Sequence, residues 1–469
     1  MTDIPSSIDQ FRIHGHQLID FIANYLDQCS HSTIPVTAYK SPEKSYANWQ
    51  QELNEPTLTP DALFEQIIHQ SIHLHHPGYI GHQVAVAQPL SILADTVASL
   101  LNNGMAVYEM GQVSVAMERA VCSCLTKIIG WQDQSTGFFT SGGTLANLTA
   151  LLTARQVCSA GSYWDQGHQS TSYAVMVSSE AHYCIARAIK IMGLGNDAII
   201  TIPVNKKFQL DVESINEIYN KALQQGKKIF AFVGNAASTG TGSYDDLETI
   251  GKFCKLHNIW FHVDGAHGGA VILSKKYNHL VQGLEMADSM TLDFHKLLQT
   301  SVLCTALLYK SSGASHQTFA QGAQYLYEDH EQEWYQLGKR TFECTKTMMV
   351  LKAYTLIHQL GLERLGADVD YRYELARKFA DIIMADNEFE LATYPQSNIV
   401  CFRYTPSNTN PGQFNQLNLE IRTRINESGQ YYIVQTSIDH KIYLRTSLMN
   451  VQTTLEDLAV LLKLIKAVK

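Results

Sequence analysis

Short apolar segments alternate with amphipathic helical patterns through the middle of this 469-residue chain. Helical patterns such as "TLANLTALLTARQ" and "DDLETIGKFCKLHN" separate several of these segments. Strands that are apolar on both faces and separated by helices predict an α/β fold with a mainly parallel sheet, covered on both sides. Ligands of such sheets bind beyond the carboxyl ends of the strands, so the loops there are where we expect chemistry. The predicted strands are "GFFTS", "YAVMVSS", "AIITIPV", "KIFAFVG", "WFHVDG", "SMTLDF" and "CTALLYK".

The two ends of the chain carry different patterns. The N-terminal part reads mostly as helix, with an amphipathic spacing in "FRIHGHQLIDFIANYLDQ". Thr59 is placed to cap the helix "PDALFEQIIHQ". Near the C-terminus, the strands "FELATY", "NIVCFRY", "YYIVQTS" and "KIYLRTS" flank one helical pattern and precede another. We therefore predict an N-terminal helical segment (1–75), a large domain (76–375) and a small C-terminal α+β domain (376–469).

Composition narrows the class of protein. With 45% hydrophobic and 17% charged residues, the chain is globular. A net charge of −9 argues against nucleic acid or an anionic membrane surface as a partner. No apolar run reaches the roughly 18–20 residues needed to span a bilayer, and the start lacks the features of a secretory signal. Nine cysteines without a spaced framework favour reduced thiols, so we expect a cytoplasmic protein.

Lys296 raises the main chemical question, because its neighbours in "DSMTLDFHKLLQTSVLCTALLYK" read as buried core. An unpaired ammonium in such a place costs several kcal/mol or shifts its pKa. Lys296 therefore either has a partner or is there to react. At the mouth of an α/β sheet, a lysine amine can form a Schiff base with an aldehyde cofactor.

Three further features follow predicted strands. The turn that contains Gly142, Gly143 and Thr144 precedes a helix, and free N–H groups at a helix N-terminus suit a phosphate. His182 follows the next strand, and Asp264 ends an apolar strand. Each feature alone also fits a cap, a core histidine or a structural ion pair. Together with Lys296 they supply what pyridoxal 5'-phosphate requires: a phosphate cradle, a ring-stacking group, an acid for the ring nitrogen and an amine.

The chain resembles the group II pyridoxal-phosphate-dependent amino-acid decarboxylases, a fold-type-I family that includes aromatic-amino-acid, glutamate, cysteine-sulfinate and diaminobutyrate decarboxylases. The lysine block "SMTLDFHKLLQTSVLCTALLYK" fits the family pattern throughout. Six further motifs occur in family order: "HPGYIGHQ", "NNGMAVYEMG", "TSGGTLANL", "EAHYCIARA", "HVDGAHGGA" and "YLRTSLMN". The "GHQ" around His82 is neither the glutamate-type nor the aromatic-type pattern, and His267 replaces the aromatic residue found in aromatic decarboxylases. The substrate therefore stays open among acidic, aromatic and diamino acids.

The resemblance implies a role for each matching residue. Lys296 would hold the cofactor as a Schiff base, Asp264 would pair with its ring nitrogen, and His182 would stack on the ring. Tyr325 would return a proton to the substrate carbon after a quinonoid intermediate. The remaining cofactor contacts would be Gly142, Gly143, Thr144, Thr239, Ala266 and His295. The substrate contacts would be Tyr79, His82, Tyr108 and Arg445.

The resemblance also implies an activity and an assembly. The expected reaction is decarboxylation of an L-amino acid to the primary amine and carbon dioxide. The expected assembly is a homodimer with shared active sites, in which residues 1–75 help to form the dimer and Tyr108 reaches the partner's site. An aminotransferase or an aldehyde-forming oxidative deaminase on the same fold is the alternative. A metal-binding protein built on His69, His73 and His76 is a more distant one, and we expect no metal site.

Overall fold

The computed structural model describes residues 8–160, 162–167, 170–320 and 334–467. It divides the chain into two compact units. The first contains Met1–His82, Lys378–Ala392 and Cys401–Lys469, and the second contains Gln83–Arg377 and Thr393–Val400. The N-terminal helices thus belong to the same unit as most of the C-terminal residues. The three-part division at residues 75 and 375 stays a prediction.

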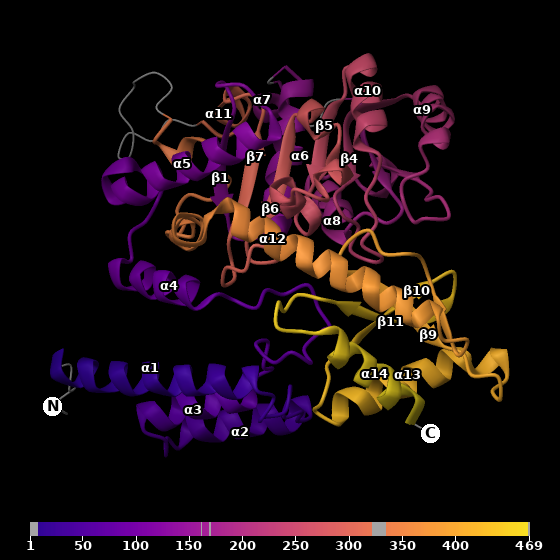
Figure 1. The fold of residues 1–469 in the computed structure, drawn as a ribbon. Coiled ribbons are helices and arrows are strands. Elements are labelled where there is room, and N and C mark those ends of the chain that lie inside the picture. Colours follow the sequence, from indigo (N-terminus) through magenta and orange to yellow (C-terminus); the bar gives the residue numbers. More distant parts are fainter. Residues whose placement is uncertain (1–7, 161, 168–169, 321–333, 468–469) are drawn as a thin grey trace. The chain divides into compact units, whose positions relative to one another are not determined.

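The second unit is built on a seven-stranded sheet with the order β1-β7-β6-β5-β4-β2-β3. Strands β3, β2, β4, β5 and β6 pair in parallel, whereas β7 is antiparallel to both β6 and β1. Figure 1 shows β1, β7, β6, β5 and β4 from left to right in this order. The predicted mainly parallel sheet is confirmed, with all seven expected strands. These are β1 (Thr136–Thr140), β2 (Ser172–Ser178), β3 (Ile199–Ile202), β4 (Lys227–Asn235), β5 (Trp260–Asp264), β6 (Ser289–Asp293) and β7 (Thr305–Tyr309).

Helices pack against this sheet, and α6 is central among them because it contacts β4, β5, β6 and β7. Helix α12 continues from the second unit into the first and has a non-helical backbone at Gly361, with φ 76°. The helices that begin in this unit are α4 (Pro89–Leu101), α5 (Gln112–Ile129), α6 (Gly143–Cys158), α7 (Ser162–Gln166), α8 (Tyr183–Ile191), α9 (Ile215–Gln224), α10 (Leu247–His257), α11 (Gly313–Phe319) and α12 (Val350–Met384).

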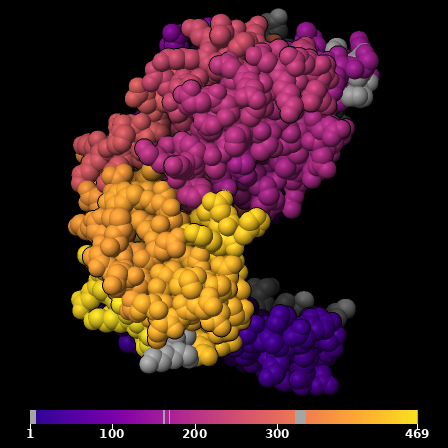
Figure 2. Space-filling model, turned by 90° about the vertical axis from the view of Figure 1, so that its right-hand side faces the viewer, coloured from indigo at the N-terminus to yellow at the C-terminus, as the bar shows by residue number. Residues whose placement is uncertain are grey.

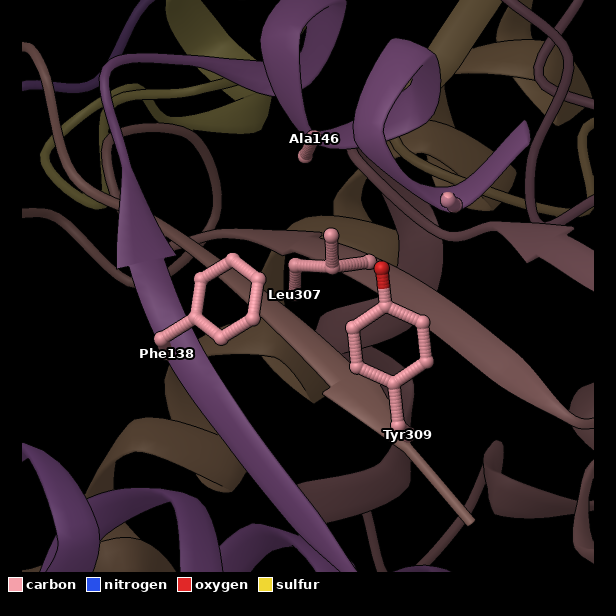
Figure 3. Packing of buried hydrophobic residues seen from close by; sticks show 5 residues of the cluster. Phe138, Ala146, Leu307 and Tyr309 are labelled. Carbon is pink, nitrogen blue, oxygen red and sulfur yellow. The ribbon is translucent and has the colours of Figure 1, made fainter. Parts of the chain in front are cut away.

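Small residues let α6 approach the sheet closely. Ala146 and Ala150 are fully buried and pack against Phe138, Leu307 and Tyr309 of β1 and β7. Figure 3 shows the two aromatic rings and Leu307 lying beneath the helix at Ala146. The Tyr309 hydroxyl lies 3.1 Å from the Thr153 hydroxyl of the same helix, so its polar end is satisfied in the core. This packing fixes where the N-terminus of α6 meets the sheet.

The first unit combines helices with a four-stranded sheet of order β10-β11-β9-β8. Thr59 caps α3 as expected, since its side chain accepts a hydrogen bond from Ala62 N, and Pro60 is the first helical residue. The predicted small α+β fold is found here. Its elements are α1 (Ile8–Ser30), α2 (Pro42–Asn54), α3 (Pro60–Gln70), β8 (Phe389–Leu391), β9 (Ile399–Tyr404), α13 (Phe414–Glu427), β10 (Val434–Ile438), β11 (Lys441–Ser447) and α14 (Leu455–Ala467).

On the face that Figure 2 shows, the magenta residues of the second unit lie next to one another. Within the described part of the chain, none of the helices has both the length and the hydropathy to cross a bilayer.

Candidate active site

A cavity of about 260 Å³ opens at the carboxyl ends of the strands in the second unit. Every residue that the sequence assigned to a cofactor lines it: Gly142, Gly143, Thr144, His182, Thr239, Asp264, Ala266, His295 and Lys296. These residues come from loops after β1, β2, β4, β5 and β6, as expected for a parallel sheet. The other lining residues are Ser141, Asn147, Cys184, Asn235, Ala237, His267, Asp293 and Leu303.

Lys296 has an ionic partner in this cavity. Its Nζ lies 2.9 Å from Oδ2 of Asp293, whose side chain is only 2% exposed. Burial favours the neutral amine, but the Asp293 carboxylate outweighs it and raises the pKa of Lys296. Burial likewise opposes ionisation of Asp293, yet Lys296 and His295 keep the pKa of Asp293 below its usual value. Lys296 is thus a paired ammonium that faces an open cavity.

His295 lies in the wall of the cavity. Its Nδ1 lies 3.0 Å from both the amide nitrogen and the carbonyl oxygen of Cys304, so it accepts from the amide or donates to the carbonyl according to the tautomer. Nε2 lies 3.6 Å from Oδ2 of Asp293. Because Cys304 engages Nδ1, Nε2 is the ring nitrogen that can meet a ligand in the cavity.

The turn before α6 fits a phosphate group. Gly142 caps the helix with φ 119°, a value that favours glycine, and α6 begins at Gly143. A Cβ at Gly143 would lie 3.3 Å from the Asp293 carboxylate and from Ala266 Cβ, so a side chain here would crowd the cavity. The first bonds of the helix run from Leu145 N and Ala146 N to Gly142 O, so the N–H groups of Gly143 and Thr144 precede them. The positive end of the helix dipole faces the same place. Together these features match a small anion held by backbone amides.

Asp264 is an anchored carboxylate, 6% exposed, at the end of β5. Oδ1 accepts from Ala266 N at 3.2 Å, and Oδ2 accepts from the Asn147 side-chain amide at 3.0 Å. Burial raises the pKa of Asp264, and the charges of Lys296 and His182 oppose that rise. A protonated ring nitrogen would compensate such a carboxylate. The arrangement therefore suits a heterocyclic cation.

His182 caps α8, and its Nδ1 accepts a hydrogen bond from Cys184 N at 3.3 Å. Burial lowers the pKa of His182, and the Asp264 carboxylate opposes this effect. A ring that is neutral at pH 7 can stack against a flat ligand without adding a charge to the cavity.

His267 occupies the position at which aromatic decarboxylases were expected to have an aromatic residue. It is buried, and its Nε2 lies 2.7 Å from Asn398 Oδ1.

Three of the four predicted substrate contacts lie together in the first unit. The Tyr79 ring stacks on Tyr432 at 5.4 Å, and the His82 ring lies 5.9 Å from the same tyrosine. Backbone bonds from Ile80 N to Tyr432 O and from Ser447 N to Ile80 O tie the segment to the strands. Desolvation lowers the pKa of His82, and the nearby charge of Arg445 lowers it further, followed by that of Arg422.

Neither Tyr108 nor Tyr325 can be assigned to the cavity. Tyr108 is in the 3-10 turn Tyr108–Met110, is 39% exposed and contacts the Tyr335 ring at 5.4 Å. It is not among the described residues that line the cavity. Tyr325 lies outside the described residues.

Sequence reasoning missed several lining residues, of which Asp293 and Asn147 matter most. Asp293 was assigned to the end of the strand "SMTLDF", although its place three residues before Lys296 was a usable signal. Asn147 was assigned to the helix "TLANLTALLTARQ", where only its polarity in an apolar stretch could have drawn attention. Both were overlooked because a strand or helix pattern explained them adequately.

The histidines of the metal alternative do not converge. The two ring nitrogens of His73 face the carbonyl oxygens of Pro35 and Ile68, and His76 Nδ1 accepts from Gly78 N. Within the described ranges, no group of three His, Cys, Asp or Glu side chains could hold a metal ion.

Comparisons with known proteins find matches over most of the chain. The family described as "Pyridoxal-dependent decarboxylase conserved domain" matches residues 42–405. The chain is 28% identical to L-2,4-diaminobutyrate decarboxylase of Acinetobacter baumannii over 415 residues, 85% of this chain and 81% of that one. It is 25% identical to aromatic-L-amino-acid decarboxylase of Bacillus atrophaeus over 466 residues, 98% and 96% of the two chains. The crystal structure of mouse CSAD superposes with a TM-score of 0.91 at 23% identity, covering 98% of this chain and 99% of that one.

The ion pair between Lys296 and Asp293 predicts a pH effect. Substitution Asp293→Asn removes the carboxylate that raises the pKa of Lys296 and leaves the burial that lowers it. The neutral amine, which attacks an aldehyde, will then be present at lower pH. We expect the pH midpoint for covalent attachment of pyridoxal 5'-phosphate to the apoprotein to move down, as followed by absorbance and borohydride trapping.

Thr305→Val is the matched control, because it removes only the hydroxyl that donates to Asp293 Oδ1 at 2.6 Å and leaves the charge in place. Its midpoint should stay near that of the wild type. An unchanged midpoint in Asp293→Asn would show that the Asp293 carboxylate does not raise the pKa of the Lys296 amine.

Proposed function

The chain belongs to the pyridoxal-dependent decarboxylase family, and from this premise we propose that it decarboxylates an L-amino acid with an acidic side chain, using Lys296 to hold the cofactor. As an enzyme it is a pyridoxal-phosphate-dependent amino-acid decarboxylase, a carboxy-lyase. The observation that carries the proposed mechanism is one cavity that contains Lys296, Asp264 and the N-terminus of α6.

Each residue of the cavity has a proposed task. Bound pyridoxal 5'-phosphate supplies an aldehyde for amines and a ring that accepts the electrons left by the departing carboxylate. Lys296 provides the amine that holds it, and Asp264 keeps its ring nitrogen protonated. The first turn of α6 and His295 Nε2 bind its phosphate, and His182 and Ala266 pack against its ring. Thr239 contributes a hydroxyl beside it.

Tyr325 is the proposed proton donor to the substrate carbon. The support is its position 29 residues after Lys296, where the resembled family has a tyrosine with this role. Protonation of carbon completes a decarboxylation, whereas failure at this step leaves the carbon open to other reactions. Protonation by Tyr325 would therefore decide whether the product is the amine or the aldehyde.

The substrate proposal rests on the charge around His82. Arg445 is the proposed partner of the substrate α-carboxylate, and it is 7% exposed. Arg445 and Arg422 both lie close enough to lower the pKa of His82, so the segment carries positive charge. A carboxylate or a sulfinate on the substrate side chain would be attracted to it. Tyr79 and His82 would face that side chain.

An exposed apolar stripe supports the proposed homodimer. Along one face of α4, Leu93, Val97, Leu100 and Leu101 are 48%, 47%, 76% and 50% exposed. Tyr108, Met110 and Val113 add apolar surface after the helix. Monomeric proteins rarely expose such a continuous patch, and a second copy of the chain would cover it. We propose that Tyr108 contributes to the partner's active site from this surface.

A cytoplasmic location belongs to the same proposal. None of the nine cysteines forms a disulfide, which suits a reducing compartment.

A panel of L-amino acids tests the substrate. With pyridoxal 5'-phosphate added, we expect carbon dioxide from L-aspartate, L-glutamate or L-cysteine sulfinate at least about tenfold faster than from L-tyrosine or L-2,4-diaminobutyrate. Lys296→Ala should abolish release from all of them. A preference for aromatic or diamino acids would contradict the acidic assignment alone. No release from any amino acid by cofactor-loaded protein would contradict the decarboxylase assignment.

Substitution Tyr325→Phe tests the proton donor. We expect amine formation to slow by about a hundredfold, with aldehyde and ammonia appearing when dioxygen is present. Product analysis by chromatography separates the amine from the aldehyde, and Tyr335→Phe serves as a control in a nearby tyrosine. Unchanged amine formation in Tyr325→Phe would show that another group delivers the proton.

Substitution Leu100→Glu tests the dimer. The chain has a mass of 52.5 kDa, so light scattering should give twice this value for the wild type. A carboxylate in the centre of an apolar interface should shift Leu100→Glu toward the monomer. Leu223→Glu on α9, where the leucine is 44% exposed, should leave the mass unchanged. A wild-type monomer would overturn the proposal.

A further inference from the structure

The face of the sheet beneath α6 carries a row of polar side chains within an otherwise apolar layer. Trp260, His262 and Asp264 alternate along β5 and therefore point to one face. On the neighbouring strand, Ser289 and Thr291 are the register partners of His262 and Asp264. The last four of these residues are at most 6% exposed. Such groups stay buried only if each finds a hydrogen-bond partner.

Asn147 of α6 connects this row to Asp264, and its amide has only one possible orientation. Its Nδ2 lies 3.0 Å from Asp264 Oδ2, an oxygen that accepts when ionised. Its Oδ1 accepts from the Thr291 hydroxyl at 2.7 Å. Nδ2 therefore donates to the carboxylate, and Oδ1 faces away from it.

The orientation of Asn147 determines the tautomer of His262. Nε2 of His262 lies 2.9 Å from Asn147 Oδ1, so this nitrogen carries the hydrogen. Burial lowers the pKa of His262 to about 3, so the ring is neutral and Nδ1 has a lone pair. Nδ1 accepts from the Ser289 hydroxyl at 2.8 Å, and Ser289 Oγ accepts from Trp260 Nε1 at 2.9 Å.

The result is a chain of hydrogen bonds with a single direction. Every donor points toward Asp264, from Trp260 through Ser289, His262 and Asn147. Hydrogen bonds in a dry interior polarise one another, and a donor aimed at a carboxylate favours its ionised form. The chain also fixes the rotation of the carboxylate, because Asn147 holds Oδ2 while Ala266 N holds Oδ1.

We propose that Asn147 and His262 are positioning residues that keep Asp264 ionised and aimed at the ring nitrogen of the cofactor. They act through Asp264, so the inference rests on the role proposed for that carboxylate. Neither residue needs to touch the reacting atoms. Losing the chain weakens the pairing of Asp264 with the ring nitrogen and leaves the phosphate and Lys296 contacts intact.

The test compares two cofactors in the holoenzyme. One is pyridoxal 5'-phosphate, and the other is its carbocyclic analogue with CH in place of the ring nitrogen. We expect Asn147→Leu, which keeps the size and removes the donor, to raise the dissociation constant of the natural cofactor by about tenfold. With the analogue the same substitution should change the dissociation constant by about twofold or less, because the partner of Asp264 is missing. Equal losses with both cofactors would show a merely structural role and overturn the proposal.

A second pair of variants covers the case in which Asn147→Leu does not fold. In His262→Gln the side-chain amide can still donate to Asn147 Oδ1, whereas His262→Leu cannot. We expect the glutamine variant to bind the natural cofactor about as well as the wild type and the leucine variant to bind it about tenfold less tightly. Equal affinities in these two variants would also overturn the proposal.

Asp264→Asn separates this inference from the function on which it rests. If Asp264→Asn raises the dissociation constant of the natural cofactor more than that of the analogue, and Asn147→Leu does not, only the positioning role fails. If Asp264→Asn raises both dissociation constants equally, the assignment of Asp264 to the ring nitrogen fails.

Discussion

One partly exposed ammonium interacts with two buried carboxylates in this protein. Asp264 and Asp293 end adjacent strands and are both largely excluded from water. Burial favours the protonated form of each acid, and the charge of Lys296 opposes this effect at both. The pKa of Asp293 falls below its usual value, whereas that of Asp264 stays above it. A ligand that takes the amine removes a positive charge from both carboxylates, so a cation placed next to Asp264 would restore the balance.

The position of α6 connects the core to this balance. Alanines at 146 and 150 let the helix rest on the aromatic side chains of β1 and β7. The same contact brings the glycine turn to the mouth of the cavity and Asn147 to Asp264. The position of the glycine turn and the orientation of a carboxylate thus depend on one helix–sheet interface. Small residues at this interface therefore serve both the core and the cavity.

Much of this could be predicted from the sequence. The seven strands were found because parallel strands buried on both faces are short, apolar and separated by helices. The glycine turn, His182, Asp264 and Lys296, which line one cavity, were assigned to a common site because they end or follow those strands. Asp293 and Asn147 were not, because a strand end and a helix interior explained them without a partner across the sheet. The grouping of the N-terminal helices with the C-terminal strands depends on long-range contacts, such as that between Tyr79 and Tyr432, which no local pattern encodes.

The segment around Tyr79 is held by residues that are distant in the sequence. Ile80 is bonded to Tyr432 on one side and to Ser447 on the other, so its conformation is set by residues more than 350 positions away. A chimera that imports the first 82 residues of a relative would meet foreign neighbours at both of these bonds. This segment can be transplanted only together with its late partners, and divergence among homologues should leave correlated changes in the two.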